Sequence, residues 1–312
     1  MSFTVVPLHN LSLAAGTNVR FGNGFTFQDL PQWVKDDKGI LKDLKSTDRN
    51  GTLEAQHALV AEYEADSFGY PDPEWKGQKP KSIQDLRFQS AMLASLAIWL
   101  RQPSTVCFTV GFHALSRLNS GPILDTPIIL QAPDHPPLRC HPKDQFNAVY
   151  VSHIAKAGEL HSVLTTVPRK NAVWAALRAF WAALTSYPPD HRYPLFWQGL
   201  ESLFGADSDR YGITRRLRER ISLFLAGDDR ERCELSDKVL ACYDMRCEIV
   251  HGRWDEGPEI DHFMAETEAI VRTVVRHMLE KPGMLGAFIS SKRDNFLDAW
   301  VQSQSLTPPQ FP

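Results

Sequence analysis

Arg246 and His251 are the two residues of this chain whose types and spacing best suit chemistry on a phosphate. They lie five residues apart, near the end of a run with the periodicity of an α-helix. A guanidinium binds phosphate oxygens, and an imidazole moves protons at physiological pH. The pair therefore suits attack by a ribose 2′-hydroxyl on its neighbouring phosphodiester. The histidine would move the proton, and the arginine would stabilise the developing charge.

The helical pattern places Arg246 among apolar neighbours. Four residues recur at the spacing of one helix face: Val239, Tyr243, Arg246 and Val250. Gly252 follows where a left-handed residue ends many helices. A buried guanidinium stays charged, so we expect a carboxylate, helix-end carbonyls or a phosphate beside Arg246. His251 lies about 140° away around an ideal helix, so only a frayed last turn and the long arginine side chain would bring the two together.

Spacing alone does not identify the pair, because Arg272 and His277 have the same separation. That second pair lies in an apolar-rich run at 270–279 with no glycine stop, and we interpret it as a solvated helix face. The context of Arg246 is different, since an arginine on an apolar face requires a partner.

Further residues are candidates for supporting roles. Glu201 lies between apolar residues on a helix expected near 194–205, and it is the best candidate partner for Arg246; the alternative is that it faces solvent. Tyr243 and Cys247 flank the arginine on its own helix. Four arginines on a helix expected at 211–226 would either track an RNA backbone or form a solvated face: Arg215, Arg216, Arg218 and Arg220.

Three blocks of the sequence resemble the Apea-like branch of the HEPN superfamily. In order they are a helix carrying Leu-Glu-x-Leu-Phe at 200–204, a helix ending in Arg-x-x-Ile at 218–221, and a tyrosine-led helix carrying Arg-x4-His-Gly at 246–252. The resemblance covers roughly residues 166–296, less than half of the chain. The chain departs from many catalytic members at Cys247, where they carry Asn, Asp or His.

The resemblance implies an α-helical bundle that forms a homodimer and cuts RNA without a metal or other cofactor. Arg246 and His251 of two protomers would then meet across a two-fold axis. Members of the family often act in anti-phage defence or as toxins, and a separate antitoxin or sensor protein would be a second partner besides RNA. The alternative is a non-catalytic module for dimerisation or nucleotide binding. In that case Arg246 would be permanently paired and His251 would cap its helix.

Composition is that of an ordinary globular protein. Hydrophobic residues make up 43% and charged residues 23% of the 312 residues, with a net charge of −3. This balance excludes a generally basic nucleic-acid coat but not a local basic groove. The start lacks the basic and apolar regions of a signal peptide, and no apolar run is long enough to span a membrane. With five cysteines and no Cys-x-x-Cys pair, we expect a cytoplasmic protein with reduced thiols.

The order of elements predicts two domains and a tail. Residues 1–165 read as an α+β domain of regulatory or sensing function, 166–300 as the all-α HEPN-like bundle, and 301–312 as a flexible tail. In the first domain we expect a hairpin at 18–27, helices at 52–63 and 82–102, and strands at 105–112, 127–130 and 148–152. Cys140, His135 and His141 lack the spacing of a zinc site, and we expect no metal there.

Overall fold

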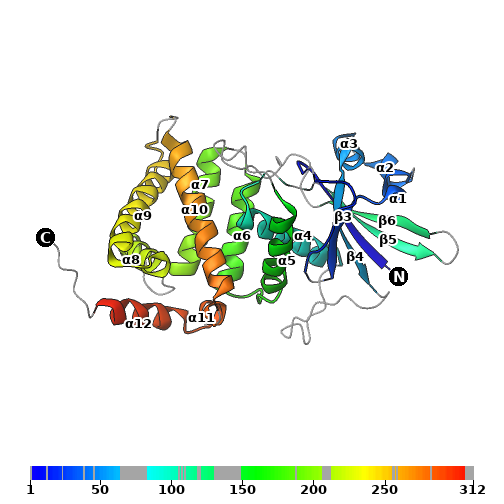
Figure 1. The fold of residues 1–312 in the computed structure, drawn as a ribbon. Helices are drawn as coiled ribbons and strands as arrows, with labels where there is room; N and C mark the ends of the chain where they lie inside the picture. The colour runs from blue at the N-terminus through cyan, green and yellow to red at the C-terminus, as the bar shows by residue number, and fades with distance from the viewer. Residues whose placement is uncertain are drawn as a thin grey trace. The chain divides into compact units, whose positions relative to one another are not determined.

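The structure, a computed structural model, describes most of the chain and divides it into two compact units (Figure 1). Residues 2–63, 83–129, 149–205 and 212–305 are described, with gaps at 12, 23, 38, 45, 105, 107, 109, 118–120, 187, 255–256, 258 and 282. One unit comprises Met1–Cys140 with Asp144–Thr166, and the other His141–Lys143 with Val167–Pro312. The first is built on an antiparallel sheet and the second on helices, so the expected α+β domain followed by a helical region is confirmed.

The first unit contains a six-stranded antiparallel sheet in the order β2-β3-β4-β1-β5-β6. The strands are β1 (Ser2–Leu8), β2 (Asn18–Arg20), β3 (Phe25–Asp29), β4 (His57–Tyr63), β5 (Val110–Arg117) and β6 (Gly121–Ile129). The expected hairpin at 18–27 is confirmed, with Val19 paired to Phe27. Its turn contains Gly22 at φ 75°, in the left-handed region that glycine adopts more readily than other residues.

Five helices accompany this sheet: α1 (Gln32–Lys35), α2 (Ile40–Asp43), α3 (Ser46–Glu54), α4 (Ile83–Arg101) and α5 (Val151–Leu164). The prediction of α4 is confirmed, and its residues 90–100 are buried throughout. Two sequence predictions are wrong. Residues 52–63 form the end of α3 and then β4. Most of the residues at 57–61 are buried, so β4 lacks the alternation of apolar and polar residues that would identify a strand from sequence. The strand expected at 148–152 is also wrong: α5 begins at Val151, residues 149 and 150 belong to no strand, and residue 148 lies outside the described residues.

The start of α5 shows why its composition was misleading. Tyr150 and Val151 are residues typical of strands, yet both are exposed, and the burial of Ile154, Ala157 and Leu160 follows helical spacing. Tertiary packing thus decides the structure here. The strand expected at 105–112 corresponds to β5, which begins later, at Val110. The strand expected at 127–130 is the end of β6, which finishes at Ile129. Residues 131–142, with the cysteine and histidines considered for zinc, lie outside the described residues.

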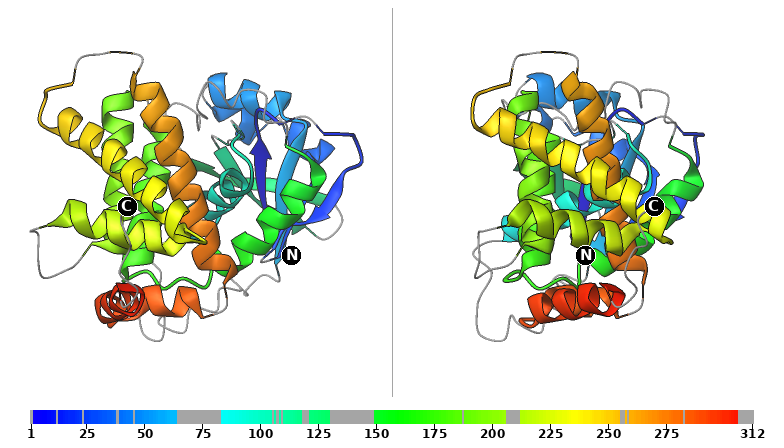
Figure 2. Two further views of the ribbon diagram at one scale, coloured as in Figure 1. Left: turned by 60° about the vertical axis from the view of Figure 1, so that its left-hand side comes forward. Right: turned by 90° about the vertical axis from the view of Figure 1, so that its left-hand side faces the viewer.

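The second unit is a bundle of helices: α6 (Ala172–Thr185), α7 (Pro189–Phe204), α8 (Ile213–Leu225), α9 (Asp229–Val250), α10 (Glu259–Glu280), α11 (Met284–Ile289) and α12 (Arg293–Ser305). Figure 2 shows α9 beside α10, with α11 and α12 at one end of the bundle. α7 begins five residues before the expected 194, because Pro189 occupies its first turn rather than ending the preceding helix. Residues 301–305 belong to α12 instead of a tail, and 306–312 lie outside the described residues.

Polar contacts inside the bundle fix how α7 meets α9 and α10. The Tyr193 hydroxyl donates to the Cys242 carbonyl oxygen at 2.7 Å and accepts from the Thr267 hydroxyl at 3.1 Å. Next to them, Arg192 and Glu268 form a buried ion pair. Such pairs impose a register on helix packing because a shift would leave a charge uncompensated. In the part of the chain that the structure describes, no helix is long and apolar enough to cross a lipid bilayer.

Candidate functional site

The helix that carries Arg246 and His251 has a well-defined start and end. At the start, the Asp228 side chain accepts a hydrogen bond from the Glu231 backbone N–H at 2.8 Å. At the end, Gly252 has φ 66° and donates to the Ile249 carbonyl at 3.1 Å, while Arg253 donates to the Glu248 carbonyl at 2.9 Å. These two bonds are those of a Schellman motif. The predicted glycine stop is therefore confirmed.

Arg246 lies opposite a carboxylate, as its place on an apolar face requires. Its Nη2 is 3.2 Å from Oε1 of Glu201 on α7, and the two side chains are 23% and 27% exposed. Nε of Arg246 is buried and makes no hydrogen bond within the described residues. Because about a quarter of each side chain is exposed, the ion pair is open to solvent. Glu201 does not simply face solvent, which decides between the two readings of that residue.

Tyr243 completes the cluster with Glu201 and Arg246. Its hydroxyl donates to Glu201 Oε1 at 3.0 Å, the same oxygen that lies next to Arg246. The guanidinium carbon of Arg246 is 5.5 Å from the centre of the tyrosine ring, within range of a cation–π contact. The ring packs edge-on against Trp197. Burial, and secondarily the charge of Glu201, raises the pKa of Tyr243, which keeps its proton available for this hydrogen bond.

His251 does not join this cluster within one chain. It caps the C-terminus of α9, its backbone N–H donates to the Cys247 carbonyl at 3.0 Å, and its side chain is exposed. The intervening Val250 is 48% exposed, which corrects the expectation that it continues the buried face. The helix face is therefore exposed beyond Arg246. Cys247 is half-buried, and its thiol makes no hydrogen bond or ion pair within the described residues.

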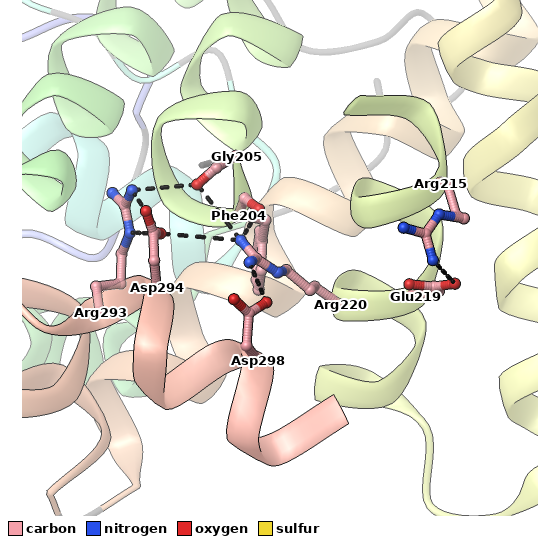
Figure 3. Close-up of polar contacts among 8 residues, drawn as sticks. All are labelled: Phe204, Gly205, Arg215, Glu219, Arg220, Arg293, Asp294 and Asp298. Carbon is pink, nitrogen blue, oxygen red and sulfur yellow. Dashed lines mark hydrogen bonds and ion pairs between the residues drawn. The ribbon is translucent and has the colours of Figure 1, made fainter. Parts of the chain in front are cut away.

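The four arginines of α8 do not share one exposed face, which corrects the idea of an RNA track made by all four; Figure 3 shows two of them, Arg215 and Arg220. Arg215 is 73% exposed and lies 3.4 Å from Glu219, one turn along. Arg218 lies 3.2 Å from Asp237 of α9, and Arg216 is half-buried. Arg220 is buried, with its side chain only 2% exposed. Burial therefore removes Arg220 from any RNA-binding face, whereas Arg215, Arg216 and Arg218 remain at least partly exposed.

Arg220 instead holds the end of α7. Its Nη1 donates to the Phe204 carbonyl at 2.6 Å, and its Nη2 donates to Asp298 of α12 at 2.6 Å. Arg293, also buried, donates to the carbonyls of Ser202 at 2.6 Å and Gly205 at 3.1 Å, and Figure 3 shows the bond to Gly205. Two guanidinium groups thus satisfy the carbonyl groups that the last turn of a helix leaves unpaired. Sequence reasoning missed this, because the partners are far apart in the chain and carry no local pattern.

The second arginine–histidine pair has a structural role in α10. The His277 ring packs against Phe224 with 4.7 Å between ring centres, and its Nε2 is buried without a hydrogen-bond partner among the described residues. Burial lowers the pKa of His277, so the neutral form is favoured. The interpretation of this pair as a fully solvated face was wrong for the histidine. The contrast with exposed His251 agrees with choosing the pair at 246 and 251 as the functional candidate.

Comparisons with known proteins identify no relative of this chain. No protein-family model matches it, and neither the curated proteins nor the solved structures contain a significant match.

Proposed function

We propose that the helical unit is a metal-independent endoribonuclease of the HEPN type, in which Arg246 binds the scissile phosphate and His251 moves protons. The observation that carries the proposal is the position of Arg246. Its guanidinium lies at the place where a buried helix face opens to solvent, one helical turn before an exposed histidine. If Arg246 bound no ligand, apolar residues in place of the ion pair would be at least as stable at such a position.

The reaction would proceed by internal attack. The 2′-hydroxyl oxygen bonds to phosphorus as one His251 accepts its proton, and the bond from phosphorus to the 5′ oxygen then breaks. A second imidazole gives the leaving 5′ oxygen its proton. The products are a 2′,3′-cyclic phosphate and a 5′-hydroxyl. Arg246 stabilises the extra negative charge that the phosphate oxygens carry in the transition state.

The second imidazole would come from another copy of the chain. On an ideal helix, two side chains five residues apart point in directions about 140° apart, so a single helix is not expected to present both to one phosphate. A homodimer that brings two α9 ends together would place Arg246 of one protomer near His251 of the other.

The test is cleavage of a fluorescent RNA in the presence of EDTA. We expect His251→Ala to lower the rate at least about 100-fold, the usual contribution of a general acid or base. His262→Ala is a matched control, since His262 is also an exposed histidine of the same unit and should leave the rate unchanged. Equal rates for His251→Ala and the parent protein would rule out the mechanism.

A second candidate function is a non-catalytic interaction or nucleotide-binding module. The ion pair between Arg246 and Glu201 favours it, because the pair compensates the cation without any ligand. The location of His251 at a helix C-terminus is also explained by the helix dipole alone. Overexpression separates the two candidates. Growth arrest that Arg246→Ala relieves supports the nuclease, whereas growth unaffected by either protein supports the module. Defence and toxin roles, with RNA and a separate antitoxin as partners, depend on the first result.

A further inference from the structure

The Arg246 guanidinium keeps hydrogen-bonding capacity that the folded chain does not use. One of its amino groups, Nη2, lies beside Glu201, whereas Nη1 and Nε have no hydrogen-bond partner among the described residues. The side chain is 23% exposed. An anion that reaches the exposed part of the guanidinium would therefore find Nη1 as a donor without a partner in the described chain, beside the Nη2 that faces Glu201.

The same guanidinium has a fixed negative charge on its other side. Glu201 Oε1 lies 3.2 Å from Arg246 Nη2, and the Tyr243 hydroxyl, donating to that same oxygen at 3.0 Å, holds the carboxylate there. Tyr243 is itself held edge-on by Trp197 and is buried. The carboxylate is thus kept in place on both sides. An incoming phosphate meets a nearly neutral pair rather than an isolated cation.

We propose that Glu201 is a specificity-determining residue that makes this site accept the singly charged phosphate of an internal phosphodiester and disfavour doubly charged terminal phosphates. The proposal rests on the proposed function, because it assumes that Arg246 meets a phosphate. Attraction to the cation and repulsion from the carboxylate both scale with the charge of the ligand. A phosphate on a nucleic-acid end or a mononucleotide carries nearly two charges above pH 7, whereas a diester carries one.

The size of the effect follows from Coulomb's law. A phosphate bound at the free edge of the guanidinium lies on the order of 7 Å from the Glu201 carboxylate, the width of the cation plus a hydrogen bond on each side. Repulsion at that distance weakens binding about 3-fold per ligand charge with the dielectric constant of water, and about 50-fold with an effective value near 20. We take about 5-fold per charge as the working expectation for a site that is partly exposed.

The experiment compares two competitors for a fluorescent 2′-O-methyl RNA, which the protein binds but cannot cut. One competitor is a dinucleoside monophosphate, which carries a single diester, and the other is a nucleoside 5′-monophosphate at pH 8. We expect Glu201→Gln to strengthen the first competitor about 5-fold and the second about 25-fold, the square of the effect of one charge. The preference for the diester should therefore fall about 5-fold.

Glu248→Gln is the matched control. It removes the same charge from the same unit, but Glu248 pairs with Arg253 at 3.0 Å and not with Arg246. We expect it to leave the ratio of the two competitors unchanged. Glu201→Ala serves as a second variant should the glutamine protein fold poorly, with the far-ultraviolet circular dichroism spectrum as the check on folding. An unchanged ratio in both Glu201 variants would overturn the proposal.

Two further results separate this inference from the proposed function. If Arg246→Ala abolishes competition by both ligands while Glu201→Gln leaves their ratio unchanged, Arg246 meets phosphate and only the specificity role of Glu201 is wrong. If Arg246→Ala binds the RNA and both competitors as the parent protein does, Arg246 does not meet phosphate, and the proposed function and this inference are both wrong.

Discussion

Replacing Arg220 by alanine tests whether the arginines of α8 act on RNA or on the fold. Arg220 donates to the Phe204 carbonyl and to Asp298, each at 2.6 Å. A hydrogen bond to a charged group contributes about 1.5–3 kcal/mol, and loss of one member of a buried ionic network costs about 3–5 kcal/mol. Asp298 is 60% exposed and regains water, so we expect the lower end, about 3 kcal/mol less free energy of unfolding.

Arg215→Ala is the matched control, since it removes the same charge from the same helix. Arg215 is 73% exposed and lies 3.4 Å from Glu219, so its loss should change the free energy of unfolding by less than about 0.5 kcal/mol. For a unit of this size, about 3 kcal/mol lowers the midpoint of thermal unfolding by about 6–12 °C.

Urea unfolding and calorimetry of the full chain measure both variants, with the helical unit followed as its own transition where the two units separate. RNA binding is measured on the same samples at a temperature where each remains folded. Equal stability of the two variants, with RNA binding lost only in Arg220→Ala, would refute the assignment of Arg220 to the fold.

Two further predictions concern packing and pH. Burial lowers the pKa of His161 to about 4, below the unfolded value, so its contribution to stability is present above pH 6.5 and is lost as the pH falls towards 4. We expect protonation of this single group to lower the free energy of unfolding by about 3 kcal/mol across that window. The urea midpoints at pH 7 and pH 4.5 should therefore differ less in His161→Leu than in the parent protein. Equal differences in the two proteins would contradict the assignment. A Cβ on Gly199 of α7 would lie 2.1 Å from the Phe180 ring, whereas one on Gly286 of α11 would meet nothing within 4 Å. Gly199→Ala should therefore destabilise the protein by about 1–3 kcal/mol, and Gly286→Ala should stabilise it by about 0.5–1 kcal/mol, with thermal unfolding as the measurement; the same sign for both would show that the glycines are not distinguished by packing.

The end of α9 was predictable because its signals are local. The apolar spacing and the glycine at 252 lie within one stretch of chain, and the helix ends at Val250 with His251 as its C-cap. The partner of Arg246 was predictable for a related reason. A carboxylate on an apolar helix face and a guanidinium on another each need compensation, so Glu201 and Arg246 identify one another without knowledge of the packing angle.

The role of Arg220 could not be predicted in this way. Its partners are helix-end carbonyls and residues of α12, and a backbone carbonyl leaves no trace in the sequence. An arginine among other arginines reads as a charged surface, and only the three-dimensional packing of α12 against α8 removes it from solvent. The ion pair of Arg192 with Glu268 was missed for the same reason, since the two residues are separated by most of the bundle along the chain.

The geometry of α9 also constrains how the candidate site would work. The helix ends in an ordered motif at Gly252 instead of fraying, so the last turn gives no sign of bringing the two candidate side chains, Arg246 and His251, together. A local rearrangement would have to break both hydrogen bonds of the Schellman motif, at a cost of about 1–3 kcal/mol. Association of two α9 ends needs no such rearrangement, because Arg246 is partly exposed and His251 is exposed in the single chain. The exposed Val250 between them then supplies apolar surface that a second copy would cover. Dimerisation and catalysis would consequently depend on the same few residues, and Val250→Glu should lower both together without altering the stability of the separate chain.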